Sequence, residues 1–143
     1  GTFLVPGTAP GGGSAALRKQ LQTAAEFFGR IDFVRMTPAP DLVLAGVPEG
    51  FSARALAQAG QVYAVYLHSG QVLQNRRPRY VYRTDKQAFA ISLNLPAGQW
   101  KAEWWNPRTG AIDGAETFSH TGGQAWVAPP EFVEDIALVL RRQ

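Results

Sequence analysis

The sequence contains no cysteine, and this absence excludes two kinds of stabilisation at once. Neither disulfide bonds nor thiolate-bound metals can hold the fold together, so a hydrophobic core must do so. Histidine is scarce as well: His68 and His120 are the only two, and neither has acidic residues at the spacing of a metal site. We therefore predict no metal and no cofactor. The lack of cysteine fits any compartment, since a domain of this size can be stable on its core alone.

Charged residues are few, and long apolar runs are missing. Asp, Glu, Lys and Arg make up 17% of the 143 residues, and the net charge is +3. This small excess permits an anionic partner but does not require one. No apolar run reaches the length of a membrane-spanning helix, and the start of the chain lacks the basic and apolar regions of a signal peptide. We expect no membrane partner, and we expect the chain to be a piece of a longer protein.

Glycine, proline and apolar residues are abundant instead. The chain has 15 glycines and 10 prolines, and 45% of its residues are hydrophobic. This composition favours a core built from many short elements joined by tight turns. Residues 89–95 alternate strictly between apolar and small or polar residues, as a half-buried strand does, and Pro96-Ala97-Gly98 then suits a turn. We predict that residues 99–105 form the next strand and pair with residues 89–95 as a hairpin.

Similar short runs recur from about residue 53 to the C-terminus, with no helical segment between them. This pattern predicts a mainly β fold, an antiparallel β-sandwich of about seven to eight strands. One N-terminal α-helix is expected before it, over residues 15–28, with Ser14 and Gly29 suited to cap its ends. The apolar residues that would share one face of this helix are Leu17, Leu21, Ala24, Ala25 and Phe28. We divide the chain into a helix and linker, residues 1–50, and a β-sandwich, residues 51–143.

A tryptophan-rich hairpin is the most distinctive local feature. On a strand, Trp100 and Trp104 share one face, and Trp105 lies on the other. The turn after it is built from Asn106, Pro107, Thr109 and Gly110, residue types that cap a turn, fix φ or adopt a left-handed conformation. We expect the first two rings to point inward and Trp105 to be exposed. Trp105 would then either cover the rim of the hairpin or, with Trp126, form a platform on which sugar rings stack.

A basic and aromatic stretch covers residues 76–83, where Tyr80 and Tyr82 alternate with arginines. Such interleaving can bind an acidic polysaccharide or a single-stranded nucleic acid through charge and stacking. It can equally form an edge strand whose charges prevent pairing with other chains. The chain has no helical reader and no RNA-binding signature, so we expect no nucleic acid partner.

Carboxylates are the test for glycosidase chemistry, which needs two of them across one scissile bond. The candidates are Glu103, Asp113, Glu116, Glu131, Glu134 and Asp135. Their turn and loop contexts do not indicate such a pair, and we expect Asp135 to bond backbone N–H groups at the start of the last strand. The serines beside the two histidines do not form a nucleophile elbow. We predict no catalytic residues in this chain.

Several motifs occur in a recognisable order. They are Tyr63-Ala64-Val65-Tyr66-Leu67, Leu95-Pro96-Ala97-Gly98, Trp105-Asn106-Pro107-Arg108-Thr109-Gly110, Pro129-Pro130 and Glu134-Asp135-Ile136-Ala137-Leu138. They resemble the C-terminal β-sandwich that follows the (β/α)8 barrel in certain bacterial glycoside hydrolases, a module labelled a "putative collagen-binding domain" of a collagenase. Its hallmarks are a Trp-x-x-Pro-x-Thr-Gly turn and a terminal Asp-x-x-Leu strand. The residues here that match these hallmarks are Trp104, Pro107, Thr109, Gly110 and Asp135.

The resemblance implies a non-catalytic accessory domain that braces the catalytic barrel of its parent chain and contacts polysaccharide, in a secreted or periplasmic enzyme. Residues 15–28 and 33–38 resemble the last barrel helix and its exit segment. Two other functions stay open. The sandwich could act as an independent carbohydrate-binding module through Trp105, Trp126, Tyr80 and Tyr82. It could also be a stand-alone glycosidase that uses the carboxylates named above. A fold resemblance by itself establishes none of these activities.

Overall fold

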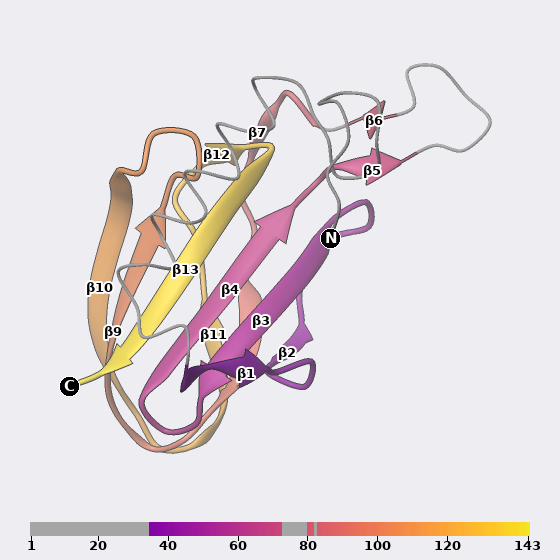
Figure 1. Ribbon diagram of the computed structural model, residues 1–143. Helices are drawn as coiled ribbons and strands as arrows, with labels where there is room; N and C mark the ends of the chain where they lie inside the picture. The colour runs from indigo at the N-terminus through magenta and orange to yellow at the C-terminus, as the bar shows by residue number, and fades with distance from the viewer. Residues whose placement is uncertain (1–34, 73–79, 82) are drawn as a thin grey trace.

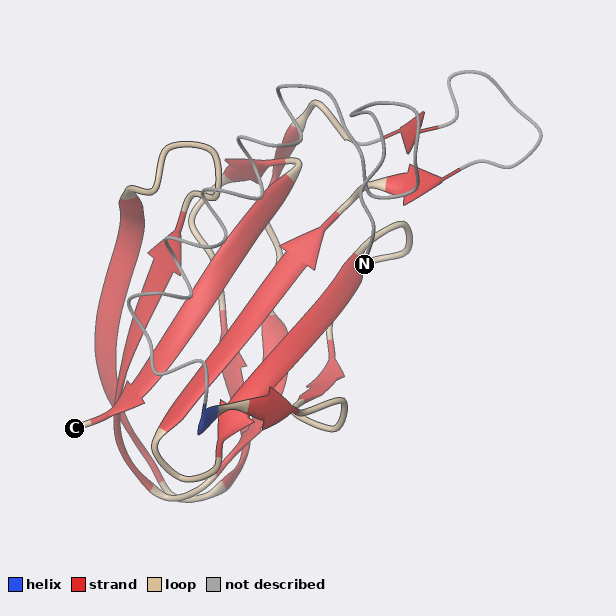
Figure 2. Ribbon diagram, in the orientation of Figure 1, coloured by secondary structure: helices blue, strands red, loops and turns tan. Residues whose placement is uncertain are grey.

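The computed structural model describes residues 35–72, 80–81 and 83–143 (Figure 1). Strands dominate the described residues, as the colouring by secondary structure shows (Figure 2). All strand pairs are antiparallel, which confirms the predicted mainly β class. The predicted helix at residues 15–28 lies outside the described residues. Among the described residues, no helix is long and apolar enough to span a membrane.

The larger sheet contains six strands in the order β1-β3-β4-β13-β9-β10. Their bounds are Thr37–Pro38 (β1), Ser52–Gln58 (β3), Val62–His68 (β4), Asp135–Arg142 (β13), Gly98–Trp105 (β9) and Ile112–His120 (β10). The last strand of the chain, β13, lies in the middle of this sheet, between β4 and β9 (Figure 1). Its sequence is apolar on both faces because both faces are buried, with Ile136, Leu138 and Leu140 in the core and Ala137 and Val139 on the outward side.

The smaller sheet contains three strands in the order β11-β8-β2. Their bounds are Gly123–Val127 (β11), Ile91–Leu95 (β8) and Val43–Ala45 (β2). Two further pairs are short: β12 (Phe132–Val133) with β7 (Lys86–Gln87), and β5 (Gln71–Val72) with β6 (Tyr80–Val81). β1 pairs with β3 in the larger sheet, and β2 pairs with β8 in the smaller sheet. Residues 37–45 therefore contribute a strand to each of the two main sheets.

The two main sheets enclose one core. Side chains that alternate along β4, β8, β9 and β13 point inward and form a single buried cluster. Trp100, Ala102 and Trp104 are all at most 2% exposed, as the alternation along this strand predicts. Apolar burial of this kind contributes about 25 cal/mol per Å² of area removed from water, so the tryptophan pair is a large part of the core.

The predicted hairpin between residues 89–95 and 99–105 is wrong. Residues 91–95 form β8 in the smaller sheet, whereas residues 98–105 form β9 in the larger one. The turn at Pro96-Ala97-Gly98 therefore carries the chain from one sheet to the other. Sequence alternation shows which side chains are buried, but it does not show which neighbour a strand pairs with.

The hairpin that follows, β9 with β10, is present and closed by backbone bonds. The N–H of Asn106 donates to the carbonyl of Ala111 at 2.8 Å, and that of Gly110 donates to the carbonyl of Asn106 at 2.8 Å. The Asn106 side-chain oxygen accepts from the N–H of Arg108 at 2.9 Å, and Gly110 has a φ of 74°, which favours glycine.

Candidate functional site

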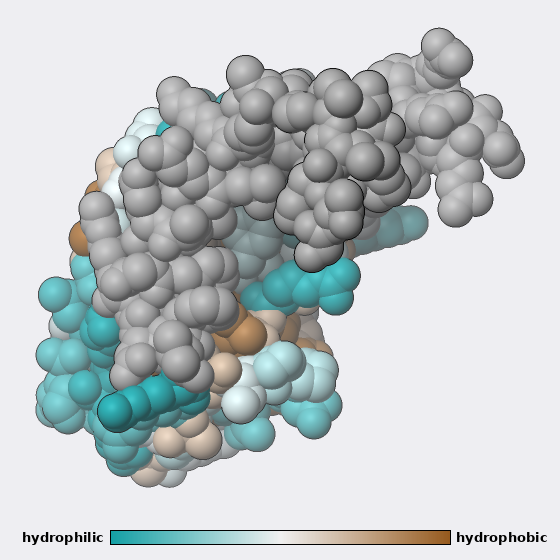
Figure 3. Space-filling view, viewed as in Figure 1, coloured by the Kyte–Doolittle hydropathy of each residue, from teal (hydrophilic) through white to brown (hydrophobic). Residues whose placement is uncertain are grey.

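The outward face of the six-stranded sheet carries apolar residues where a solvated sheet would be polar. Its buried cluster, called here the outer apolar face, consists of Met36, Ala64, Trp105, Ala137 and Val139. The partly buried Leu56, Val62 and Tyr66 pack against it. In the part of this view that Figure 3 colours, a small group of hydrophobic atoms (brown) near the centre lies beside hydrophilic atoms (teal). A sheet with one face on a core and the other in water normally alternates between apolar and polar residues.

Trp105 belongs to this outer apolar face, and the expectation that its ring would be exposed is wrong. Its relative exposure is 7%. Trp105 lies opposite Ala137 on β13, and Ala137 in turn lies opposite Tyr66 on β4. On its other side, Trp105 lies opposite Ile112 on β10. Trp105 is therefore buried on the outward side and does not offer a ring face to a sugar.

One end of the same face is polar, because three adjacent strands there carry polar side chains in register. Ser52, His68 and Asp135 lie opposite one another on β3, β4 and β13. The Ser52 hydroxyl and the His68 Nε2 are 2.7 Å apart, and the His68 ring stacks on Tyr66 with centroids 5.3 Å apart. Burial lowers the pKa of His68 below its ordinary value, and Arg54 lowers it further, while Asp135 partly offsets both.

The sequence suggested that Asp135 bonds backbone N–H groups at the start of the last strand, and among the described residues no such bond is found. Instead, the Tyr66 hydroxyl donates to its Oδ2 at 2.6 Å. Side chains stand roughly perpendicular to the sheet, so Asp135 on β13 and Tyr66 on β4, which are diagonal neighbours, project from the same face and can meet there. Asp135 is 6% exposed, and this burial raises the pKa of its carboxyl, against smaller lowering effects of Tyr66, Arg108 and His68.

Glu134 links the tryptophan hairpin to the last strand, a role that sequence reasoning missed. Its buried carboxylate forms an ion pair with Arg108, which lies in the turn of that hairpin. Its carbonyl accepts from the N–H of Ser69 at 2.9 Å and from the Ser69 hydroxyl at 3.0 Å. Its φ of 69° is unusual for a residue with a side chain. The two ion-pair partners are 26 positions apart, so no local pattern could have identified them.

Among the carboxylates considered for catalysis, the chain neighbours Glu134 and Asp135 are both buried and both interact with Arg108, and the other four lie on other segments. Glu131 pairs with Lys86 at 3.4 Å on the surface, and Glu134 is bound to Arg108. Asp113 and Glu116 are exposed on β10, and Glu103 is half-buried on β9. Among the described residues, no group of three His, Asp or Glu side chains could hold a metal ion.

Trp126 is the predicted platform residue that the structure does expose. Its relative exposure is 59%, and it lies on the outward side of β11 in the smaller sheet. It is opposite Ser92 on β8, and Ser92 lies opposite Ala45 on β2. Of the two tyrosines named with it, Tyr80 lies in β6, and Tyr82 lies outside the described residues.

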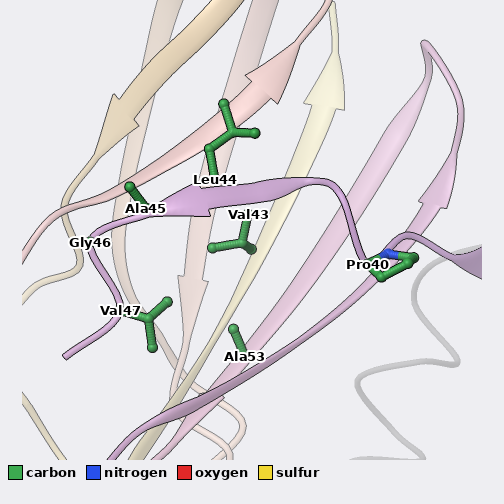
Figure 4. Close-up of a pocket in the computed structure, with 7 residues that line it drawn as sticks. All are labelled: Pro40, Val43, Leu44, Ala45, Gly46, Val47 and Ala53. Atoms are coloured by element: carbon green, nitrogen blue, oxygen red, sulfur yellow. The ribbon is translucent and has the colours of Figure 1, made fainter. Parts of the chain in front are cut away.

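A hollow of about 390 Å³ lies beside β2, at the edge of the smaller sheet (Figure 4). Its lining residues are Pro40, Val43, Leu44, Ala45, Gly46, Val47 and Ala53. Gly46 has a φ of 94°, and a Cβ at this position would lie 2.3 Å from the Ala90 carbonyl oxygen, so the backbone here requires glycine. No lining side chain can ionise or act as a nucleophile, so the hollow has no catalytic chemistry.

Comparison with known proteins identifies one family and a fold shared with solved structures. A family model described as "Putative collagen-binding domain of a collagenase" matches residues 38–141. One solved structure, described as a glycoside hydrolase, is 12% identical to this chain and has a TM-score of 0.58. The match covers 99% of this chain and 31% of the length of that protein. A glycoside hydrolase family 5 protein from Bacteroides vulgatus is 12% identical, covers 98% of this chain and 30% of its own, and has a TM-score of 0.54.

At this identity the likeness concerns the fold alone, and the chain spans about a third of the length of these two proteins. No curated protein matches the chain.

Proposed function

Because the chain belongs to the family described as "Putative collagen-binding domain of a collagenase", and because its fold is also that of a part of longer glycoside hydrolases, we propose that it is an accessory domain of such an enzyme. It carries no catalytic residues of its own. It braces the catalytic barrel of its parent chain and contacts polysaccharide. Such an enzyme works where polysaccharide is found, so we place the chain in a secreted or periplasmic protein.

The observation that carries this proposal is the outer apolar face. A two-layer sandwich that stood alone in water would have polar residues on the outward side of its larger sheet. Here Trp105, Ala137 and Val139 are each at most 7% exposed on that side. Apolar residues that cover a sheet on its second face are typical of a sheet placed between two layers. These residues are already buried within this chain, so we propose that the catalytic domain extends the layer that covers them and does not fill an open face.

The connection to that domain comes from the N-terminal side. Met36, the second of the described residues, packs in the outer apolar face. The helix expected over residues 15–28 has an apolar stripe of the kind that such a face would receive. In this arrangement the junction between barrel and sandwich lies within residues 1–50, of which residues 37–45 already contribute β1 and β2 to the sheets, and residues 51–143 form the rest of the accessory domain.

The test uses the longer protein that contains this chain, with Leu56→Glu introduced into the outer apolar face. Leu56 is only partly buried, so the sandwich itself should still fold. We expect the carboxylate of the new glutamate to loosen the contact between the sandwich and the barrel. The longer protein would then unfold at a lower temperature, and a protease would cut it at the junction between the two domains. Gln124→Glu, on the other sheet, is the matched control and should leave both measurements unchanged. If the longer protein contains no barrel, or if L56E and Q124E behave alike, the bracing role is wrong.

A further inference from the structure

The strands of the smaller sheet contain no charged residue. β2, β8 and β11 have the sequences VLA, ISLNL and GQAWV. The larger sheet, in contrast, carries charged side chains on most of its strands, among them Arg54, Lys101, Glu103 and Arg141. Since charge of one sign attracts polymers of the other, the smaller sheet is suited to a partner without charge.

Trp126 supplies a rigid aromatic ring on the outward side of this sheet. Its cross-strand partner Ser92 also points outward, since it alternates with the core residues Ile91 and Leu93, and yet it is 0% exposed. Neighbouring side chains must therefore cover Ser92, whose cross-strand neighbours are Trp126 on β11 and Ala45 on β2. Trp126 itself is 59% exposed, so a large part of its indole is open to the solvent.

Two amide side chains stand beside this ring. Gln124 and Asn94 lie opposite each other on β11 and β8, and both are exposed. They are one outward position along from the pair Trp126 and Ser92, a distance of about 7 Å along a strand. An amide both donates and accepts hydrogen bonds, as a sugar hydroxyl does. The outward patch thus combines a stacking surface with neutral hydrogen-bonding groups.

We infer that this patch, formed by Trp126, Gln124 and Asn94, binds a neutral polysaccharide chain. The pyranose ring stacks on the indole, and its hydroxyls bond the two amides. This inference rests on the accessory role proposed above and adds to it the site and the class of ligand. A proline-rich peptide is the competing occupant, but such peptides dock in grooves lined by several aromatic rings, and Trp126 is the single aromatic residue in the three strands of this sheet.

The test measures binding of the 143-residue chain to soluble polysaccharides by affinity gel electrophoresis and titration calorimetry. The neutral probes are hydroxyethylcellulose, glucomannan and arabinoxylan, and polygalacturonate is the acidic one. We expect binding to at least one neutral probe, no stronger binding to the acidic one, and a loss of about tenfold in affinity for Trp126→Ala. Ile112→Ala is the matched control, because it removes an apolar side chain of similar exposure, 46%, from β10 in the larger sheet.

Two further variants separate this site from a general effect of the tryptophan. Gln124→Ala and Asn94→Ala should each weaken binding by about threefold, without moving the unfolding temperature. If no neutral probe binds, or if W126A binds as tightly as the parent chain, the inference is overturned. Binding of a collagen-like peptide that W126A abolishes would also overturn it. None of these outcomes affects the bracing role, which the L56E experiment tests separately.

Discussion

Trp105 and Trp126 both lie on outward sides of the sandwich, yet they differ strongly in their exposure to solvent. Trp105 is 7% exposed on the six-stranded sheet, and Trp126 is 59% exposed on the three-stranded one. The neighbours of Trp105 are apolar, and they form a second buried cluster with it. The outward neighbours of Trp126 are a serine and two amides. An outward position on a strand therefore does not decide whether a ring is available to a ligand, because the composition of the surrounding face decides it.

The difference also separates two kinds of role. The outer apolar face is suited to permanent contact in a layered fold, since its five cluster residues are already buried within the chain. The Trp126 patch is suited to reversible contact, since its amides remain solvated when no ligand is bound. In our proposals the larger sheet contacts the catalytic domain of the enzyme, and the smaller sheet binds the polysaccharide.

The largest expected effect comes from removing the buried ring. Trp105→Ala should lower the free energy of unfolding by about 3–5 kcal/mol, the usual cost of deleting a large buried aromatic side chain. Urea unfolding followed by circular dichroism would measure it. Trp105→Phe is the control and should recover most of the loss. A W105A chain as stable as its parent would mean that the outer apolar face does not contribute to the fold.

The ion pair beside that face gives a smaller effect. Arg108→Ala would leave the Glu134 carboxylate, whose side chain is 7% exposed, without its charged partner. Because the arginine is half-exposed, we expect a loss of about 1–2 kcal/mol, between the values for buried and for surface pairs. Thermal unfolding of R108A and of the double variant R108A/E134Q would show it, since the second change removes the buried charge. Equal melting temperatures for R108A and the parent chain would contradict the role of Glu134 as a link.

The polar end of the outer apolar face should make stability depend on pH. The pKa of His68 is lowered from 6.5, so the unfolded state binds more protons between the lowered value and 6.5. Stability should fall as the pH falls through that window, and His68→Gln should remove this slope. The variant must keep the polar and charged groups around His68, because they also affect its pKa. These groups are Ser52, Arg54, Asp135 and, near Asp135, Arg108.

Asp135 should act in the opposite direction. Its pKa is raised from 3.8, so the native state keeps the proton longer and loses stability as the pH rises from 3.8 through the raised value. Asp135→Asn should remove this loss of stability with rising pH. Urea midpoints measured from about pH 3 to 8 would test both groups. If H68Q and D135N both show the slopes of the parent chain, these two residues do not carry the pH dependence.

The smallest effect is expected at the exposed ring. Trp126→Ala should change the free energy of unfolding by no more than about 0.5 kcal/mol, as is usual for surface substitutions. The same urea experiment measures it beside W105A. A loss comparable with that of W105A would remove the contrast between the two faces and would assign Trp126 to the fold as well.

Much of the larger architecture could be predicted from the sequence. Alternation placed Trp100 and Trp104 inward, and turn chemistry located the bend between β9 and β10. The pairing of β8 could not be predicted, because residues 91–95 have the same pattern whether they pair with β9 or with β2 and β11. The bonds between Tyr66 and Asp135 and between Arg108 and Glu134 join segments far apart in the chain, and no local signal indicates such contacts.

The sequence by itself determined the class of fold, the inward faces of the strands and the turn at residues 106–110, because these depend on backbone preferences and on the period of side chains along a strand. Only the tertiary structure decided the exposure of the two candidate tryptophans. That exposure depends on packing: Trp105 lies between Ala137 and Ile112 in the outer apolar face, whereas Trp126 lies opposite Ser92 and outside both buried clusters. Strand order and register set these neighbours, and position in the chain does not.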